Sequence, residues 1–280
     1  MKTPEQLKGA VRNIAKRNNL LSQEVLQMFF FERILERLSL SKYKDNFILK
    51  GGLLISSMIG ISERTTMDMD TTVCGIHMEK NVIKKIIEEI ISMDIGDGIG
   101  FEFIKIEPIR EDEAYNNFRV SIKATYGKVN NPMKIDITTG DEIIPSAIRY
   151  SYKMMFENRE VPVMAYSLET ILAEKYETII RRNIGNTRAR DFYDLFVLFR
   201  SRKKEIRKDV LKLAVRHTAS KRDSLELLNE YDEICEEIEK EPELHKLWKN
   251  YIKDNIYASH LKFENVVRNV LEVGKFIEEN

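Results

Sequence analysis

Two aspartates, Asp68 and Asp70, stand two positions apart in a segment that follows a Gly-Gly pair. In a β-strand, side chains two residues apart point to the same face about 6.6 Å apart, so both carboxylates would leave one surface together. Carboxylate oxygens are ligands that suit Mg²⁺. The spacing therefore predicts one or two Mg²⁺ ions held between these carboxylates and the phosphates of a nucleotide.

The Gly-Gly pair, Gly51 and Gly52, predicts an anion site upstream of the aspartates. Glycine adopts positive φ readily, and a helix that begins just after the pair presents unpaired backbone N–H groups to a phosphate. Alone, such a pair indicates a plain turn, and an Asp-x-Asp pattern indicates a solvated strand edge. Met67 and Met69 alternate with the aspartates, which predicts one buried strand face and favours a functional interpretation of the combination.

These residues need a strand, a turn, a short helix and a second strand to hold them. We expect the first strand at 47–50, the helix at 53–59 and the second strand, which begins with the carboxylates, at 67–73. A later strand at 132–139 also alternates with period two, which places Asp136 on its polar face.

Two motifs stand in order between about residues 47 and 200. The first is Leu49-Lys-Gly-Gly52 followed by Arg64-Thr-Thr-Met-Asp-Met-Asp70; the second is Leu168–Arg182 followed by Arg188–Leu195. Together they resemble the AbiEii/AbiGii toxin family, a branch of the DNA polymerase β-like nucleotidyltransferase superfamily. The resemblance implies an α+β fold, in which a nucleotidyltransferase-type mixed β-sheet with flanking helices is followed by an all-helical C-terminal domain.

The resemblance also implies roles for individual carboxylates. Asp68, Asp70 and Asp136 would be the metal ligands and catalytic residues, with Asp136 completing the site from a neighbouring strand and helping to activate the attacking hydroxyl. The alternative for Asp136 is a surface aspartate at a sheet edge.

The second motif supplies a cation and two more carboxylates. A lysine in this context is usually a solvated charge, but the resemblance implies that Lys175 neutralises the phosphates of the nucleotide and the leaving pyrophosphate. An aspartate of the motif would contribute to the site, and spacing does not choose between Asp191 and Asp194. The alternative for this pair is an ion-pair network that fastens two helices together.

One departure from the superfamily concerns the phosphate cradle. The residue after Gly51-Gly52 is Leu53, where superfamily members commonly have serine. Thr66 stands where the AbiEii-like group tends to keep a hydroxyl, so we expect Thr66 to join the two glycines and Lys175 in nucleotide binding.

Composition bounds the class of protein. The chain has 280 residues, of which 43% are hydrophobic and 32% charged, and its formal net charge is zero, which argues against a protein that is basic throughout. Cys74 and Cys235 lack metal-ligand spacing and predict reduced thiols. No signal peptide and no apolar run of eighteen residues is present, so we expect a cytoplasmic protein without membrane contact.

The remaining pattern separates an α+β part from a helical part. Amphipathic helices are predicted at 5–18, 22–39 and 81–92, strands at 101–107 and 118–125, and one strand near 152–156 inside a connection that spans 140–166. From Ser167 onward the pattern is helical, up to a last helix at 261–277. We expect a nucleotidyltransferase domain at 1–160 and a helical C-terminal domain at 161–280.

Charge is segregated in the helical part. From Lys175 to Arg222 there are fifteen Lys or Arg and five Asp or Glu, and from Asp223 to Glu243 there are ten acidic residues and one lysine. The basic block predicts either an RNA-backbone surface or a plain solvated helix. The acidic block would pair with it or receive a basic partner.

These observations predict a Mg²⁺-dependent nucleotidyltransferase that moves a nucleoside monophosphate from a nucleoside triphosphate (NTP) to a hydroxyl. By resemblance, the acceptor would be RNA, in particular the 3′ end of tRNA, and the protein would be the toxin of a toxin–antitoxin or phage-defence (abortive infection) system with a cognate antitoxin. The alternatives are a small-molecule nucleotidyltransferase of the antibiotic-modifying kind and a non-catalytic nucleotide- or partner-binding module.

Overall fold

The computed structural model describes residues 3–109, 117–140 and 143–279. The chain divides into two compact units, Met1–Asp141 with Ala147–Ala165, and Glu142–Ser146 with Tyr166–Asn280. The boundary expected near residue 160 falls at the start of the last strand. None of the helices in these ranges has both the length and the apolar composition that crossing a bilayer requires.

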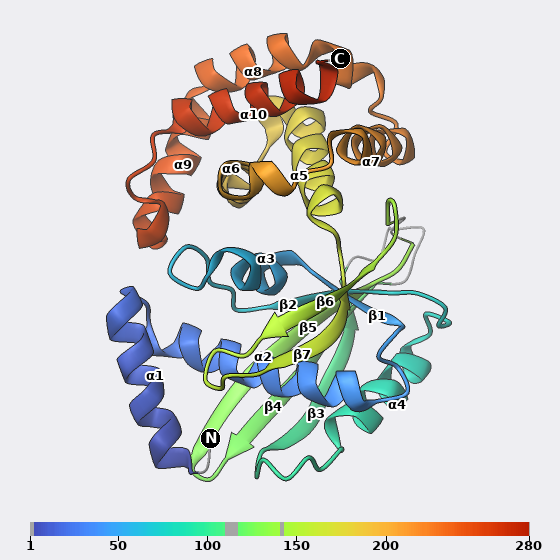
Figure 1. Ribbon diagram of the computed structural model, residues 1–280, viewed down its shortest axis with the longest axis vertical. Coiled ribbons are helices and arrows are strands. Elements are labelled where there is room, and N and C mark those ends of the chain that lie inside the picture. The colour runs from blue at the N-terminus through green and yellow to red at the C-terminus, as the bar shows by residue number, and fades with distance from the viewer. Residues whose placement is uncertain (1–2, 110–116, 141–142, 280) are drawn as a thin grey trace. The chain divides into compact units, whose positions relative to one another are not determined.

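The first unit is built on one seven-stranded sheet with the strand order β3-β4-β5-β2-β1-β7-β6 (Figure 1). The pairs β2–β5 and β1–β7 are parallel and the other pairs are antiparallel, so the sheet is mixed, as expected. The strands are β1 (Phe47–Lys50), β2 (Met69–Val73), β3 (Gly100–Pro108), β4 (Phe118–Tyr126), β5 (Val129–Thr138), β6 (Ile148–Lys153) and β7 (Glu160–Ala165).

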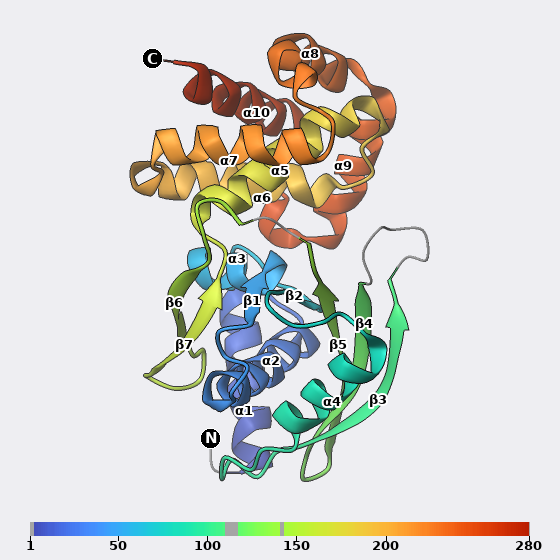
Figure 2. The ribbon, with the colours of Figure 1, turned by 90° about the vertical axis from the view of Figure 1, so that its right-hand side faces the viewer.

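Helices α2 and α4 cover one face of this sheet and lie within its curve (Figure 2). Along β4 and β5, buried apolar residues alternate with more exposed polar residues, so the apolar side faces the core and the other side forms the open face. The helices of this unit are α1 (Pro4–Asn18), α2 (Ser22–Leu40), α3 (Gly51–Ile59) and α4 (Lys80–Ile91).

Helix α2 is buried over most of its length, and its polar side chains fasten the surrounding loops. Glu24 accepts a hydrogen bond of 2.6 Å from the Thr65 hydroxyl, and Arg37 donates two, of 2.9 and 2.8 Å, to the carboxylate of Asp97. Glu32 accepts one of 2.7 Å from the Met155 backbone N–H, between β6 and β7. Because a buried polar group is costly when unpaired, these contacts fix the loops relative to the helix.

The structure corrects three boundaries of the sequence prediction. The single strand expected near 152–156 is a hairpin of β6 and β7, in which Pro162 lies at an exposed position and pairs with Ser151 across the hairpin. Helix α3 begins at Gly51 rather than at residue 53. Strand β2 begins at Met69, so Asp68 lies in the bend before the strand, and Met67, expected to be buried, is 44% exposed.

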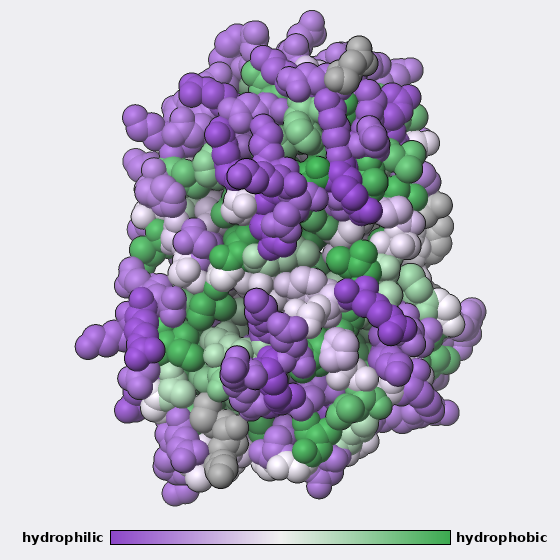
Figure 3. All heavy atoms as spheres, viewed as in Figure 1, coloured by the Kyte–Doolittle hydropathy of each residue, from purple (hydrophilic) through white to green (hydrophobic). Residues whose placement is uncertain are grey.

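The second unit is helical, as expected for the C-terminal part. Hydrophilic side chains dominate the face shown in Figure 3, in keeping with the high charged fraction. Within the unit, Tyr231 and Tyr176 pack closely against Gly274 of the last helix. A Cβ atom at this residue would lie only 2.4 Å from the Tyr231 ring. The helices are α5 (Leu168–Arg182), α6 (Ala189–Arg202), α7 (Lys208–Lys221), α8 (Tyr231–Lys240), α9 (Pro242–Asp254) and α10 (Phe263–Glu278).

The buried carboxyl group of Glu32 makes the stability of the protein pH-dependent. Burial raises the pKa of Glu32 to about 8, well above the ordinary value of 4.5. Between these two pH values the unfolded chain has lost the proton that the folded protein keeps, so we expect the free energy of unfolding to fall as pH rises. The expected fall is on the order of 5 kcal/mol, since one pKa unit corresponds to about 1.4 kcal/mol.

Chemical denaturation of the wild type and of Glu32→Gln at pH 5, 7 and 9 measures this effect. The amide keeps an acceptor for the Met155 N–H and cannot ionise, so the variant should lose most of the pH dependence and exceed the wild type in stability at pH 9. Glu88→Gln, on the exposed side of α4, is the matched control and should follow the wild type. Parallel curves for Glu32→Gln and the wild type would contradict the assignment.

Candidate active site

A row of four charged residues crosses the open face of the sheet. Lys50 on β1 lies opposite Asp70 on β2, Asp70 lies opposite Asp136 on β5, and Asp136 lies opposite Arg119 on β4. Residues directly opposite each other on neighbouring strands project from the same face. The two carboxylates therefore lie side by side, with a cation at each end of the row.

The outer cations are fixed by hydrogen bonds. Arg119 donates from Nε and Nη2 to the two oxygens of Asp136, at 2.7 Å each. This bidentate contact raises the pKa of Arg119 above its ordinary value, and the charges of Asp68 and Asp70 add to the effect. At the other end, Lys50 donates from Nζ to the hydroxyl of Thr138 at 2.8 Å.

The backbone of Gly51 makes room for the carboxylate of Asp70. Gly51 has a φ of 67°, and a Cβ atom at this residue would lie 2.0 Å from Oδ2 of Asp70. A Cβ atom at Gly52 would similarly lie 2.7 Å from the hydroxyl oxygen of Thr66. The glycine pair is thus explained by the close approach of two site residues as well as by the turn that starts α3.

The first turn of α3 keeps the features of an anion site. Its N-cap residue, Lys50, makes no side-chain capping hydrogen bond to the backbone N–H groups at this end of the helix. Together with the helix dipole, these groups suit a phosphate. Thr66 is buried and its hydroxyl bonds the backbone of Asp68, accepting from the N–H at 3.3 Å and donating to the carbonyl at 3.0 Å.

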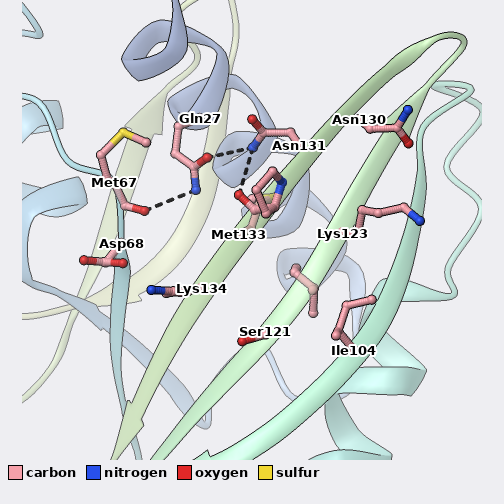
Figure 4. Close-up of a pocket in the computed structure, with 12 residues that line it drawn as sticks. Gln27, Met67, Asp68, Ile104, Ser121, Lys123, Asn130, Asn131, Met133 and Lys134 are labelled. Atoms are coloured by element: carbon pink, nitrogen blue, oxygen red, sulfur yellow. Dashed lines mark hydrogen bonds between the residues drawn. The ribbon is translucent and has the colours of Figure 1, made fainter.

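A relay of side-chain amides holds the segment before Asp68 (Figure 4). The Gln27 amide of α2 donates to the Met67 carbonyl at 3.2 Å and accepts from the Asn131 amide at 2.6 Å. Asn131 accepts in turn from Gln23 at 2.6 Å, at the exposed end of the relay. Gln27 and Asn131 are each only 1% exposed, so these bonds form where water does not compete.

The oxygen donors of Asp68, Asp70 and Asp136 have the chemistry of a Mg²⁺ site, and the Arg119 cation already lies within the field of all three. Both oxygens of Asp136 accept hydrogen bonds from Arg119, so the guanidinium already offsets the charge of this carboxylate. Over residues 3–109, 117–140 and 143–279, no three His, Cys, Asp or Glu side chains are grouped to hold a metal ion. The chemistry of the three carboxylates suits a divalent cation, and their arrangement in this structure does not form a ready-made metal site.

The second motif forms a compact cluster between α5 and α6. Lys175 Nζ lies 2.5 Å from Oδ1 of Asp191 and 3.0 Å from Oδ2 of Asp194, and both carboxylates are buried. Burial alone would lower the pKa of Lys175, but the charges of Asp194 and Asp191 outweigh it and raise that pKa. The spacing left the choice between the two aspartates open, and both contact the lysine.

Part of the basic block is engaged in ion pairs within the second unit. Glu177, which is fully buried, accepts from Arg181 Nε at 2.7 Å and Arg222 Nη1 at 2.5 Å. Arg207 pairs with Glu169 at 3.0 Å. These arginines stabilise the helices, which reduces the share of the block that could meet a nucleic acid.

Residues 33–269 match the family described as "Nucleotidyl transferase AbiEii toxin, Type IV TA system". The chain belongs to the AbiEii nucleotidyltransferase toxin family. It is therefore a nucleotidyltransferase of a toxin–antitoxin system, which implies a nucleotide substrate and an antitoxin partner and confirms the family resemblance of the two motifs.

Two solved structures from Helicobacter pylori share the fold of this AbiEii family member. JHP933 is 15% identical with a TM-score of 0.54, and the match covers 92% of this chain and 93% of that one. A putative nucleotidyltransferase is also 15% identical with a TM-score of 0.53, covering 92% and 96%. A comparison with curated proteins found no match.

Lys50, Arg119 and Gln27 are site residues that sequence reasoning missed. Lys50 stands next to the glycine pair and was part of the first motif, but nothing in the sequence shows that it lies opposite Asp70. Arg119 belongs to an alternating strand, and its register against β5 is a property of the folded sheet. Gln27 lies on a helix that the sequence marks only as apolar.

Gly51→Ala should disturb the site, because the new Cβ would collide with Asp70 and the φ of 67° disfavours alanine. We expect a loss of more than about 1 kcal/mol in unfolding free energy and a fall of about 100-fold in nucleotidyl transfer. Gly9→Ala, on an exposed helix face with no atom within 4 Å of its Cβ, is the matched control and should be neutral or stabilising. Equal stability and equal transfer activity of the two variants would contradict a steric requirement for glycine at position 51.

Gln27→Leu should break the amide relay and leave the Met67 carbonyl and the Asn131 amide without this partner. Urea denaturation should show a loss of about 1–3 kcal/mol, the usual cost of a buried group whose partner is removed. Gln23→Leu, at the exposed end of the same relay, should cost no more than about 0.5 kcal/mol. A similar loss of unfolding free energy in the two variants would show that burial does not determine how much a hydrogen bond of the relay stabilises the protein.

Proposed function

We propose that this nucleotidyltransferase requires Mg²⁺ and transfers a nucleoside monophosphate from an NTP to an RNA, in particular to the 3′ end of tRNA. The observation that carries the proposal is the pairing of Asp70 with Asp136 on one sheet face, with Asp68 in the bend before β2 and the start of α3 beside Asp70. Membership of a toxin family supports the further proposal that this transfer acts in the cytoplasm as the toxic step of a toxin–antitoxin pair, with phage defence as its role.

Each residue of the site has a place in this reaction. The backbone N–H groups from Gly51 onward bind the triphosphate, and Thr66 keeps the bend that presents Asp68. Asp68 and Asp70 would hold the metal, with Asp136 as the third carboxylate beside them. A bound Mg²⁺ would neutralise phosphate charge and align the acceptor hydroxyl with the α-phosphate.

Proton transfer and charge neutralisation fall to the remaining groups. Asp136 accepts the proton of the attacking hydroxyl once Arg119 no longer occupies its oxygens. For Lys175, which lies in the second unit, we propose phosphate neutralisation on the family resemblance alone; within that unit Asp191 and Asp194 contact the lysine and raise its pKa. The acceptor oxygen forms a bond to the α-phosphorus, the bond from the α-phosphorus to the oxygen that bridges to the β-phosphorus breaks, and pyrophosphate leaves with that oxygen.

Incubation of the purified protein with Mg²⁺, each NTP radiolabelled at the α-phosphate and total bacterial tRNA tests this proposal. We expect label on RNA with one or more NTPs, and a loss of at least about 100-fold for Asp68→Asn, since a metal ligand contributes several kcal/mol of charge stabilisation. Asp45→Asn, an exposed turn residue of the same unit, is the matched control and should keep wild-type activity.

Other outcomes would favour the alternatives. Label on a small-molecule hydroxyl and none on RNA would contradict the RNA acceptor and favour an antibiotic-modifying type of reaction. Activity that survives both Asp68→Asn and removal of divalent cations with a chelator would contradict metal dependence.

A further inference from the structure

A groove of about 380 Å³ runs along the open face of β3, β4 and β5 and borders the candidate active site at Asp68 (Figure 4). Its volume lies in the range of about 300–1,000 Å³ that is usual for ligand sites. The buried amides of Gln27 and Asn131 form one wall, so that wall is rigid. The proposed chemistry so far assigns no ligand to this groove.

The register of the sheet places cationic side chains in the groove at increasing distance from the carboxylates. Lys134 lies two residues before Asp136 on the same strand and face, about 6.6 Å along it. Lys123 on β4 lies opposite Pro132 of β5, and Pro132 is two residues further from Asp136 than Lys134 is. The groove therefore follows the strands away from Asp136, as an extended ligand would.

The charges along the groove suit phosphates. Lys134 is exposed. Lys123 pairs with Glu102 at 2.8 Å, but the two side chains are 41% and 59% exposed, and an ion pair so solvated contributes little. A phosphate can therefore compete for Lys123 at small cost, and both lysines can neutralise a polyanion.

The sides of the groove supply apolar surface. Met67 and Ile104 are large hydrophobic side chains that are 44% and 50% exposed, and they line the groove from the bend before β2 and from β3, respectively. Between them, Ser121 offers a hydroxyl. A single strand of nucleic acid presents phosphates that suit these cationic groups and base faces that can contact these apolar side chains.

The groove lies on one side of the carboxylates and the glycine turn on the other. In the strand order, β5, β4 and β3 follow β2 in one direction, whereas β1, which leads into Gly51, follows it in the other. A nucleotide at the start of α3 and a ligand in the groove would thus reach Asp70 from opposite sides. Such an arrangement suits a reaction with two substrates.

We propose that this groove binds the single-stranded segment of the RNA acceptor that precedes its terminal nucleotide, with Lys134 and Lys123 on its phosphates. The inference rests on the proposed function, because it assigns a place to the acceptor of that reaction. Lys134 sets the position of the strand nearest the reacting hydroxyl, and Met67 and Ile104 contact bases.

Fluorescence anisotropy of a short single-stranded RNA with a free 3′ hydroxyl tests the groove directly. Between about 50 and 200 mM salt, we expect Lys134→Glu to raise the Kd about 5–10-fold and to lower the slope of log K against log salt by about one. Lys134→Met, which removes the charge and keeps the length, should show a smaller rise. The Kd for NTP with Mg²⁺, measured by calorimetry, should stay at the wild-type value for both.

Lys85→Glu is the matched control, because Lys85 is exposed on α4, which covers the other face of the sheet. It should leave RNA binding unchanged. Weaker NTP binding instead of weaker RNA binding in the Lys134 variants would assign the groove to the nucleotide and overturn the inference. Wild-type RNA affinity in both Lys134 variants would also overturn it.

The transfer assay separates failure of this inference from failure of the proposed function. If the wild type labels RNA and both Lys134 variants label and bind it as the wild type does, only the groove assignment fails. If the wild type neither binds nor labels RNA, the RNA acceptor itself fails.

Discussion

The first unit depends on the balance of charge around Asp70 and Asp136. These carboxylates lie opposite each other on neighbouring parallel strands, about 4.8 Å apart, where two like charges repel. Lys50 and Arg119 extend the row on both sides and supply the opposite charge, and Arg119 does so through two hydrogen bonds. The negative charge of this paired-carboxylate row is thus offset by cations that the sheet itself provides.

Two further constraints set the position of the carboxylates. Gly51 has no Cβ, which allows the Asp70 carboxylate to approach the backbone where α3 starts. The relay from Gln23 through Asn131 to Gln27 fixes the carbonyl of Met67, and Asp68 follows directly. Three parts of the chain therefore position the carboxylates: the strands of the sheet, the turn at Gly51 and helix α2.

The sequence was informative where the relevant pattern is local. Period-two alternation found the strand of Asp136, and the glycine pair marked the turn before α3. Contacts between residues far apart in the sequence could not be predicted from it. Arg119 is 17 positions from Asp136, and Gln27 is 40 positions from Met67. The hairpin of β6 and β7 was predicted as a single strand, and its second strand carries Pro162 at an exposed position, where a missing N–H is tolerated.

The contact between Arg119 and Asp136 also bears on how the protein is made. It supplies an internal counter-ion, so the strand pair is electrically balanced before any ion arrives. In small zinc domains, by contrast, the metal is a condition of folding. Here Lys50 and Arg119 offset the charges of Asp70 and Asp136 within the chain itself, so neutralisation of this row of the sheet does not wait for a bound cation.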